Sequence, residues 1–183
     1  MIAEAAKKLL DNGIAIIPLE PNMKHNFDKD ILTKDYSVKD LIPNGNLGVN
    51  LKKSNWFNIG GKTKAYFKPD SLNELVVFLK KFGNKGKILT LGAGSNVLIN
   101  DKTFDGVIIK LGKNFSNISA LPNKTIIAGS ATTDKKLSEF ASENNIGGLE
   151  FLSCIPGSIG GGIRMNSGCF GEEFKDILLS VQA

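Results

Sequence analysis

The most constraining feature of the chain is the run Ile88-Leu89-Thr90-Leu91-Gly92-Ala93-Gly94-Ser95-Asn96-Val97-Leu98-Ile99. Apolar residues on both sides of the two glycines predict a short strand, a tight turn and a second strand-like run. Glycine permits a positive φ and leaves no Cβ between the backbone and a ligand. Unpaired backbone N–H groups at such a turn point one way and bind anions, typically a phosphate or pyrophosphate. The run therefore predicts a fold built around an anion-binding turn.

A second glycine cluster, Ile155-Pro156-Gly157-Ser158-Ile159-Gly160-Gly161-Gly162, follows later in the chain. Two such loops in a chain of 183 residues indicate a large phosphorylated cofactor that is held at two points. The first turn fits the dinucleotide-binding fingerprint of a Rossmann fold poorly, because its third glycine is missing. No acidic residue stands at a strand end about twenty residues further on, where a ribose hydroxyl would need it.

Composition and charge exclude several classes of function. The chain is 42% hydrophobic and 22% charged, which is ordinary for a globular protein that buries a core. Its formal net charge of +5 comes from scattered lysines, with Arg164 as the only arginine. Arginine dominates specific phosphate and base recognition, so we read the charge as a solvated surface and do not expect nucleic acid binding.

Further features bear on compartment and metals. We expect neither a membrane span nor a signal peptide, because no apolar run is long enough and the N-terminus carries an early acid. Cys154 and Cys169 are expected to be reduced thiols of a cytoplasmic protein. His25, the only histidine, is expected to be exposed, and we expect no metal site.

Hydrophobic periodicity predicts the elements along the chain. Ser71 with Glu74 three residues later forms a capping box that opens one helix, and Asn144-Asn145 closes another. A polar, Pro-punctuated stretch covers residues 20–46 and predicts loops. The helices are expected at 3–10, from 71 to about 82 and at 133–142, and the strands at 14–19, 47–51, 64–68, 88–91, 107–111, 125–129 and 177–181. Taken alone, Trp56-Phe57 followed by two glycines is typical of a core anchor and a turn.

Four blocks together resemble one known family. They are Asn55-Trp56-Phe57-Asn58-Ile59-Gly60-Gly61, Thr90–Leu98, Gly148–Gly162 and Arg164-Met165-Asn166-Ser167-Gly168-Cys169-Phe170-Gly171-Glu172-Glu173. In this order they resemble the UDP-N-acetylenolpyruvoylglucosamine reductases, flavoenzymes of peptidoglycan precursor synthesis. The resemblance covers roughly residues 54–183.

The resemblance implies an α+β fold, namely an FAD-binding domain of the vanillyl-alcohol-oxidase (PCMH) type built from two subdomains with FAD between them. The backbone amides of one turn would hold the FAD pyrophosphate, a second loop would contact the cofactor, and a third segment would pass near the flavin. NADPH would reduce the FAD, which passes a hydride to the enolpyruvyl double bond of UDP-N-acetylglucosamine enolpyruvate. The implied cofactor residues are Gly92, Ala93, Gly94, Ser95 and Asn96 of the turn, Pro156, Gly157, Ser158, Gly160 and Gly161 of the second loop, and Asn166, Ser167 and Gly168 of the third segment.

The family's catalytic residues find no counterpart in this chain. They are a Tyr-Arg pair, a proton-donating serine and a glutamate, all beyond the matched region, and Arg164 does not match the substrate-binding arginine. We therefore assign no catalytic residue and expect a C-terminally truncated FAD-binding domain at residues 54–183, inactive alone, with a second chain as a possible source of the substrate domain.

Residues 1–53 are expected to be an unrelated N-terminal extension. Gly13–Pro21 and Asn46–Val49 faintly resemble the opening of bifunctional DNA primase/polymerase domains. The carboxylates that such a domain needs for metal-dependent nucleotidyl transfer are missing after Val49. Two alternatives to a reductase portion stay open: a non-catalytic flavin- or nucleotide-binding protein, and a nucleic-acid-binding module that uses the N-terminal segment. A yellow colour on purification would separate the reductase interpretation from both alternatives.

Overall fold

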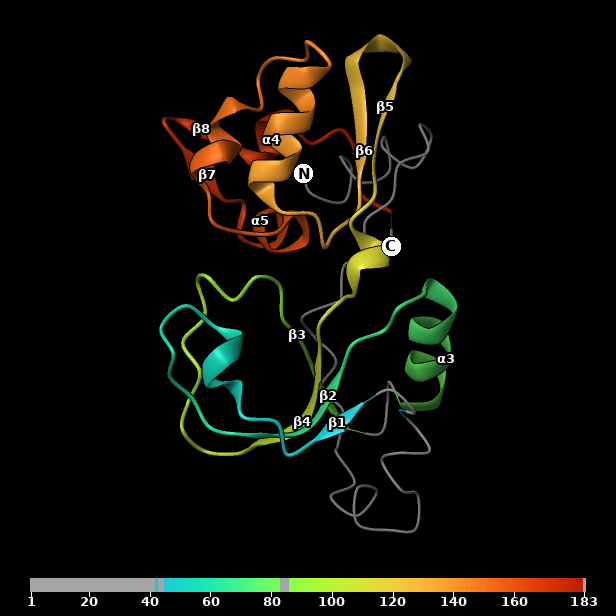
Figure 1. Cartoon of the computed structure of the whole chain (residues 1–183), viewed down its shortest axis with the longest axis vertical. Coiled ribbons are helices and arrows are strands. Elements are labelled where there is room, and N and C mark those ends of the chain that lie inside the picture. Colours follow the sequence, from blue (N-terminus) through green and yellow to red (C-terminus); the bar gives the residue numbers. More distant parts are fainter. Residues whose placement is uncertain (1–41, 43–44, 83–85, 183) are drawn as a thin grey trace. The chain divides into compact units, whose positions relative to one another are not determined.

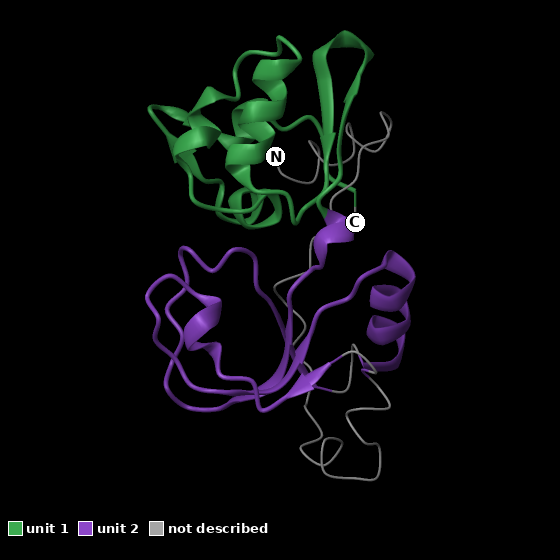
Figure 2. Ribbon diagram, in the orientation of Figure 1, with its two compact units in different colours: residues 1–23, 116–183 green, residues 24–115 purple. Residues whose placement is uncertain are grey.

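The computed structural model of the chain describes residues 42, 45–82 and 86–182 (Figure 1). These residues form two compact units, one ending at Phe115 and the other beginning at Ser116 (Figure 2). We call the first the sheet unit and the second the helical unit. The helix expected at 3–10, the strand expected at 14–19, His25 and the segment Gly13–Pro21 lie outside the described residues.

A four-stranded mixed sheet is the centre of the sheet unit. Its strand order is β1-β2-β4-β3, with β2 and β3 each parallel to β4 and with β1 antiparallel to β2. In chain order the elements are β1 (Asn46–Leu47), η1 (Leu51–Ser54), β2 (Thr63–Phe67), α3 (Leu72–Phe82), β3 (Lys87–Thr90), β4 (Phe104–Ile109) and η2 (Lys113–Phe115).

The two faces of this sheet are covered differently, because successive side chains of a strand point to opposite faces. On one face, Phe78 of α3 packs against Phe67 of β2, and Phe82 stacks on Phe78 in the same cluster. On the other face, Ile108 of β4 contacts Leu51 of η1 and residues of the segment that follows β3. The buried residues of this second cluster and the partly buried ones packed against it are Leu51, Leu91, Ile108, Tyr66, Val97, Ile99 and Phe104. The glycine turn is therefore part of the layer that covers this second face.

The start of α3 shows one half of the predicted capping box, because Ser71 caps the helix while the Glu74 carboxylate reaches Asp70 and not Ser71. The Glu74 N–H donates to Ser71 Oγ at 3.2 Å, and the Glu74 carboxylate accepts from the Asp70 N–H at 2.8 Å. The first bond satisfies one of the N–H groups that a helix start leaves without an intrahelical partner, and the second fixes the residue that precedes the cap. The predicted strands 64–68, 88–91, 107–111 and 125–129 are confirmed within one to three residues at each end.

The helical unit packs its helices and a hairpin around Leu152 and Phe174. The hairpin β5–β6 is antiparallel, and η3 with Asn123 at φ +66° makes its turn. Other buried members of this core are Leu137, Phe151 and Ile159. In chain order the elements are β5 (Ile118–Leu121), η3 (Pro122–Lys124), β6 (Thr125–Ala128), α4 (Asp134–Glu143), η4 (Glu150–Cys154), α5 (Ile159–Met165), β7 (Gly168–Cys169), β8 (Glu172–Glu173) and α6 (Phe174–Ile177).

Three sequence predictions of local structure are wrong. The strand expected at 47–51 is β1 alone, and Leu51 begins η1, where Asn50 caps the helix by accepting the Lys52 N–H. The second apolar run, 97–99, is a loop whose alternate side chains pack on Ile108. The strand expected at 177–181 is replaced by α6 and a loop, because Glu173 and Asp176 cap a helix start reciprocally.

The sheet unit includes residues that precede the expected domain boundary at 53/54. Strand β1 pairs with β2, and both Ile42 and Leu51 are buried in the cores of this unit. The matched residues 54–183 contribute to both units. The boundary itself stays a prediction, and so does the nature of residues 1–53.

Candidate functional site

The glycine turn presents a row of backbone amides without partners inside the protein. None of the N–H groups of residues 92–96 donates a hydrogen bond to another described residue. The side chains of Ser95 and Asn96 likewise form no hydrogen bond within the described ranges. Gly92 and Asn96 are exposed, and Ala93 and Ser95 are half-buried. Successive unpaired N–H groups at a turn are a typical anion-binding arrangement, so this row fits an anionic ligand.

The segment that carries Asn55 and Trp56 lies directly against this turn. The Trp56 N–H donates to the Gly94 carbonyl at 3.1 Å, and further along the Gly61 N–H donates to the Asn100 carbonyl at 2.9 Å. Gly94 has φ +77°, and a Cβ added there would lie 2.2 Å from the Ser54 carbonyl oxygen. A Cβ at Gly61 would lie 2.2 Å from the Asp101 carbonyl oxygen. Glycines of both sequence blocks are thus needed for the two segments to approach each other closely. We call residues 55–61 and 92–100 the paired loops.

The Asn55 side chain fixes the first of the paired loops. It is 5% exposed, and its Nδ2 donates to the carbonyls of Leu51 at 2.9 Å and Ile59 at 2.8 Å. Its Oδ1 is buried and accepts no hydrogen bond from the residues that the structure describes. The adjoining η1 carries Lys52 and Lys53, both exposed. Their charges favour an anion near the turn.

Trp56 and Phe57 are not the core anchor that their sequence pattern suggests. Their exposed fractions are 61% and 53%, because the neighbouring Leu51 and Asn55 occupy the buried positions of this segment. Two large aromatic side chains therefore stand in solvent next to the amide row.

The second glycine loop is built differently from the first. Its Gly157 N–H donates to the Ile155 carbonyl at 3.0 Å, and its Gly160 N–H donates to the Ser130 carbonyl at 2.9 Å. The Ile159 N–H donates to the Thr132 carbonyl at 2.9 Å. Pro156 has no N–H, Ser158 is buried, and Gly161 lies in the first turn of α5. Most backbone N–H groups of this loop thus donate to carbonyls of the helical unit. A ligand would meet the surface of the loop and few free N–H donors.

Asp134 is the unusual group beside this second loop. It is fully buried at the start of α4, and neither carboxylate oxygen has a hydrogen-bond partner within the described part of the chain. Its Oδ2 occupies the space that a Cβ on Gly157 would need, at 2.3 Å. Burial raises the pKa of this carboxyl to about 7, because the charged form is poorly solvated there.

The third predicted segment joins the end of α5 to the β7–β8 hairpin. Asn166 ends α5 with φ +48°, donates from Nδ2 to Glu173 at 2.8 Å and accepts the Lys175 N–H at 2.9 Å. The Ser167 N–H donates to the Gly162 carbonyl, and Gly168 pairs with Glu173. These contacts are structural, and the role of Asn166, Ser167 and Gly168 toward a flavin stays a prediction.

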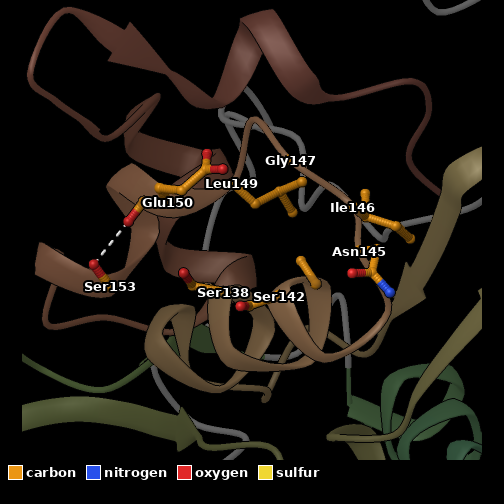
Figure 3. A pocket seen from close by; sticks show the side chains of 9 residues that line it. Ser138, Ser142, Asn145, Ile146, Gly147, Leu149, Glu150 and Ser153 are labelled. Carbon is orange, nitrogen blue, oxygen red and sulfur yellow. Dashed lines mark hydrogen bonds between the residues drawn. The ribbon is translucent and has the colours of Figure 1, made fainter.

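A cavity of about 410 Å³ lies elsewhere in the helical unit, between α4 and η4 (Figure 3). Its polar groups include the hydroxyls of Ser138 and Ser142, while Ser153 Oγ donates to the Glu150 carbonyl at 2.7 Å and the Gly148 N–H donates to the Glu150 carboxylate at 2.8 Å. No lysine or arginine lines it, so it does not suit an anionic cofactor. None of the predicted cofactor residues contributes to this cavity.

The described part of the chain holds neither a metal-binding cluster nor a membrane-spanning helix. No group of three or more His, Cys, Asp or Glu side chains is placed to hold a metal ion there. No described helix is both long and apolar enough to cross a membrane. Cys154 and Cys169 are free thiols.

Sequence reasoning located the amide row but missed the residues that support it. Lys52, Lys53 and Asn55 gave no separate signal, because a single sequence does not show which segments meet. The same holds for Asp134 beside the second glycine loop. The glycine pair Gly60-Gly61 was the one available hint of a close backbone approach.

Comparison with known proteins agrees with this geometry. Residues 63–183 match the FAD binding domain family. Over 138 residues the chain is 70% identical to the UDP-N-acetylenolpyruvoylglucosamine reductase of Pelagibacter ubique, covering 75% of this chain and 46% of that protein. It is 47% identical over 134 residues to the enzyme of the same name from Rickettsia akari, covering 73% of this chain and 45% of that protein.

A solved structure shows the same fold. The crystal structure of UDP-N-acetylenolpyruvylglucosamine reductase (MurB) from Thermus caldophilus superposes with a TM-score of 0.58 at 28% identity, over 70% of this chain and 44% of that one. The chain spans less than half the length of these relatives. The expected α+β fold of the FAD-binding type is confirmed, with FAD as the cofactor. The chain belongs to the FAD-binding domain family.

Proposed function

We propose that this chain is the FAD-binding portion of an NADPH-dependent reductase that converts UDP-N-acetylenolpyruvoylglucosamine to UDP-N-acetylmuramate in peptidoglycan precursor synthesis. The observation that carries the proposal is the row of free amides at residues 92–96. Support also comes from the reductases of this name that share 70% and 47% identity with the chain. The cytoplasm is the proposed compartment, in keeping with two free thiols.

The free amides are the part of the chain that best fits a pyrophosphate. The residues that would hold it are Gly92, Ala93, Gly94, Ser95 and Asn96, with Lys52 and Lys53 adding positive charge nearby. Pro156, Gly157, Ser158, Gly160 and Gly161 are proposed as the second contact with the cofactor. When bound, FAD supplies the hydride chemistry of the reductase. The protein's contribution is to bind and orient the cofactor by backbone donors that need no rearrangement.

Catalysis on the enolpyruvyl substrate is proposed to need groups beyond those that the described residues supply. We assign the role of proton donor to none of the described side chains, and Asp134 is buried away from solvent. Loss of a positioned acid removes roughly 10²–10⁴-fold of rate. A second chain or segment that carries a substrate-binding domain would complete the enzyme.

A binding titration and an activity assay test the proposal together. The purified chain is titrated with FAD under equilibrium dialysis, and ADP is added as a competitor that carries the pyrophosphate and the adenosine but lacks the flavin. We expect saturable binding of one FAD per chain and displacement by ADP. Substrate-dependent NADPH oxidation is expected only when a complementing substrate domain is added. A folded chain that binds no FAD would refute the proposed cofactor site. A chain that turns over the substrate without a complementing domain would refute the proposal that catalysis needs further groups.

A further inference from the structure

The paired loops form one continuous surface of the sheet unit. Hydrogen bonds join them at Trp56–Gly94 and at Gly61–Asn100, so the two segments run side by side between these points (Figure 1). Their inward side chains pack on the sheet, where Val97 and Ile99 join the cluster around Ile108. The outward side of the same loops is therefore the side on which a ligand of the amide row must lie.

Three large apolar side chains of these loops are exposed in the described part of the chain. Trp56 is 61% exposed, Phe57 53% and Leu98 75%. Scattered exposed apolar residues are normal, but several on one short stretch of surface mark a binding site. Here the stretch adjoins five unpaired amides, which points to a ligand with both an anionic part and a flat apolar part.

The position of Trp56 is fixed before any ligand arrives. Its backbone N–H bonds to the carbonyl of Gly94 in the turn itself. On its N-terminal side, Asn55 is held by two side-chain hydrogen bonds to Leu51 and Ile59. An aromatic ring that starts from such a fixed backbone loses little conformational freedom on binding, which favours affinity.

We infer that Trp56 and Phe57 bind a planar heteroaromatic ring of the dinucleotide whose pyrophosphate lies on the amides of residues 92–96. This inference rests on the proposed function. Aromatic side chains stack on flat heteroaromatic rings, and the attraction does not depend on base-specific hydrogen bonds. FAD offers two such rings, adenine and isoalloxazine. Separate titrations with ADP and FMN identify which of them contacts Trp56.

The test compares three variants in FAD titrations that are followed by the flavin's own absorbance. Trp56→Ala is expected to weaken FAD binding by about tenfold to one hundredfold, the effect of removing one stacked aromatic. Trp56→Phe keeps a ring and is expected to retain most of the affinity. Leu72→Ala is the matched control, since Leu72 is similarly exposed, at 58%, on α3 of the same unit. Thermal melting checks that each variant is folded.

Trp56 also reports the contact directly, because it is the only tryptophan of the chain. ADP and FMN are titrated separately while tryptophan emission is recorded. A change of tryptophan emission with ADP, which does not absorb that emission, places adenine at Trp56. If FMN protects Trp56 from acrylamide quenching and ADP does not, the isoalloxazine lies there.

The possible failures are distinguishable. If the wild-type chain binds FAD and Trp56→Ala binds it equally well, the inference is wrong while the proposed function stands. If neither ADP nor FMN alters Trp56 although FAD binds, the inference is again overturned. If the folded wild-type chain binds none of the three ligands, both the proposed function and the inference fail.

Discussion

At the scale of single residues, Gly94 joins the fold to the proposed chemistry. It is buried and has φ +77°, and the Ser54 carbonyl oxygen occupies the space that a Cβ at this position would need. Sequence reasoning assigned its importance to room for a ligand, whereas the structure shows that the near contact is with the protein's own backbone. Substitution here acts first on the paired loops and only through them on the cofactor.

Gly94→Ala is expected to destabilise the sheet unit and to abolish FAD binding. The left-handed backbone alone costs an alanine about 1–2 kcal/mol, and the contact at 2.2 Å adds to that cost. Gly48→Ala is the control, since Gly48 has φ +63° but nothing within 4 Å of its added Cβ. Urea unfolding should show a distinctly larger loss for Gly94→Ala. Equal losses for the two variants would mean that the turn does not depend on close packing against Ser54.

Asp134 gives the helical unit a pH dependence of known sign. Its folded-state pKa is about 7, above the ordinary 3.8, so between these values the folded chain holds a proton that the unfolded chain releases. Stability from this group is therefore fully present below about pH 4 and lost as pH rises through 7, by up to about 4 kcal/mol. Asp134→Asn removes the titration and should flatten the decline of unfolding free energy between about pH 4 and 7. An unchanged pH profile in the variant would show that the carboxyl is solvated or paired.

At the scale of elements, local sequence signals decided where helices begin. The Ser71 and Glu74 pair predicted the start of α3, and Thr133 caps α4 by accepting the Lys136 N–H at 3.2 Å. By contrast, α5 is a helix of seven residues that contains three glycines, so its own propensity is poor. It is held by tertiary packing of Ile159 in the core, and no local pattern could predict that.

Most strands and the amide-bearing turn could be predicted from the sequence, since alternation and glycine placement are local. The loop at 97–99 was mistaken for a strand because Val97 and Ile99 pack on a sheet without joining it. The stretch 177–181 was mistaken because apolar content alone does not identify a pairing partner. The exposure of Trp56 could not be predicted either, since it depends on Leu51 and Asn55 taking the buried positions.

The two N-cap residues Thr133 and Ser158 of the helical unit test whether the capping hydrogen bond determines the contribution of each cap to stability. Thr133→Ala removes a side-chain acceptor at the start of α4 and should cost about 1 kcal/mol. Ser158→Ala removes the N-cap side chain of α5, which makes no such hydrogen bond, and should cost less. Guanidinium unfolding of both variants gives the comparison. A larger loss for Ser158→Ala would show that its hydroxyl has a role in the fold that the capping geometry does not reveal.

At the scale of the whole molecule, the described residues divide into two units that each bury their own core. The sheet unit holds the amide row and the exposed aromatics, and the helical unit holds the second glycine loop and the buried Asp134. Each unit therefore carries one of the two glycine loops, and protection of each loop can be measured separately.

Hydrogen exchange of the chain with and without FAD tests the central claim most directly. The amides of residues 92–96 have no partner among the described residues and should exchange quickly in the free chain. Saturating FAD should slow their exchange strongly, while the amides of α3, already bonded within the helix, should not change. If FAD binds and exchange at residues 92–96 stays fast, the pyrophosphate does not lie on this turn, and the account of the site is wrong.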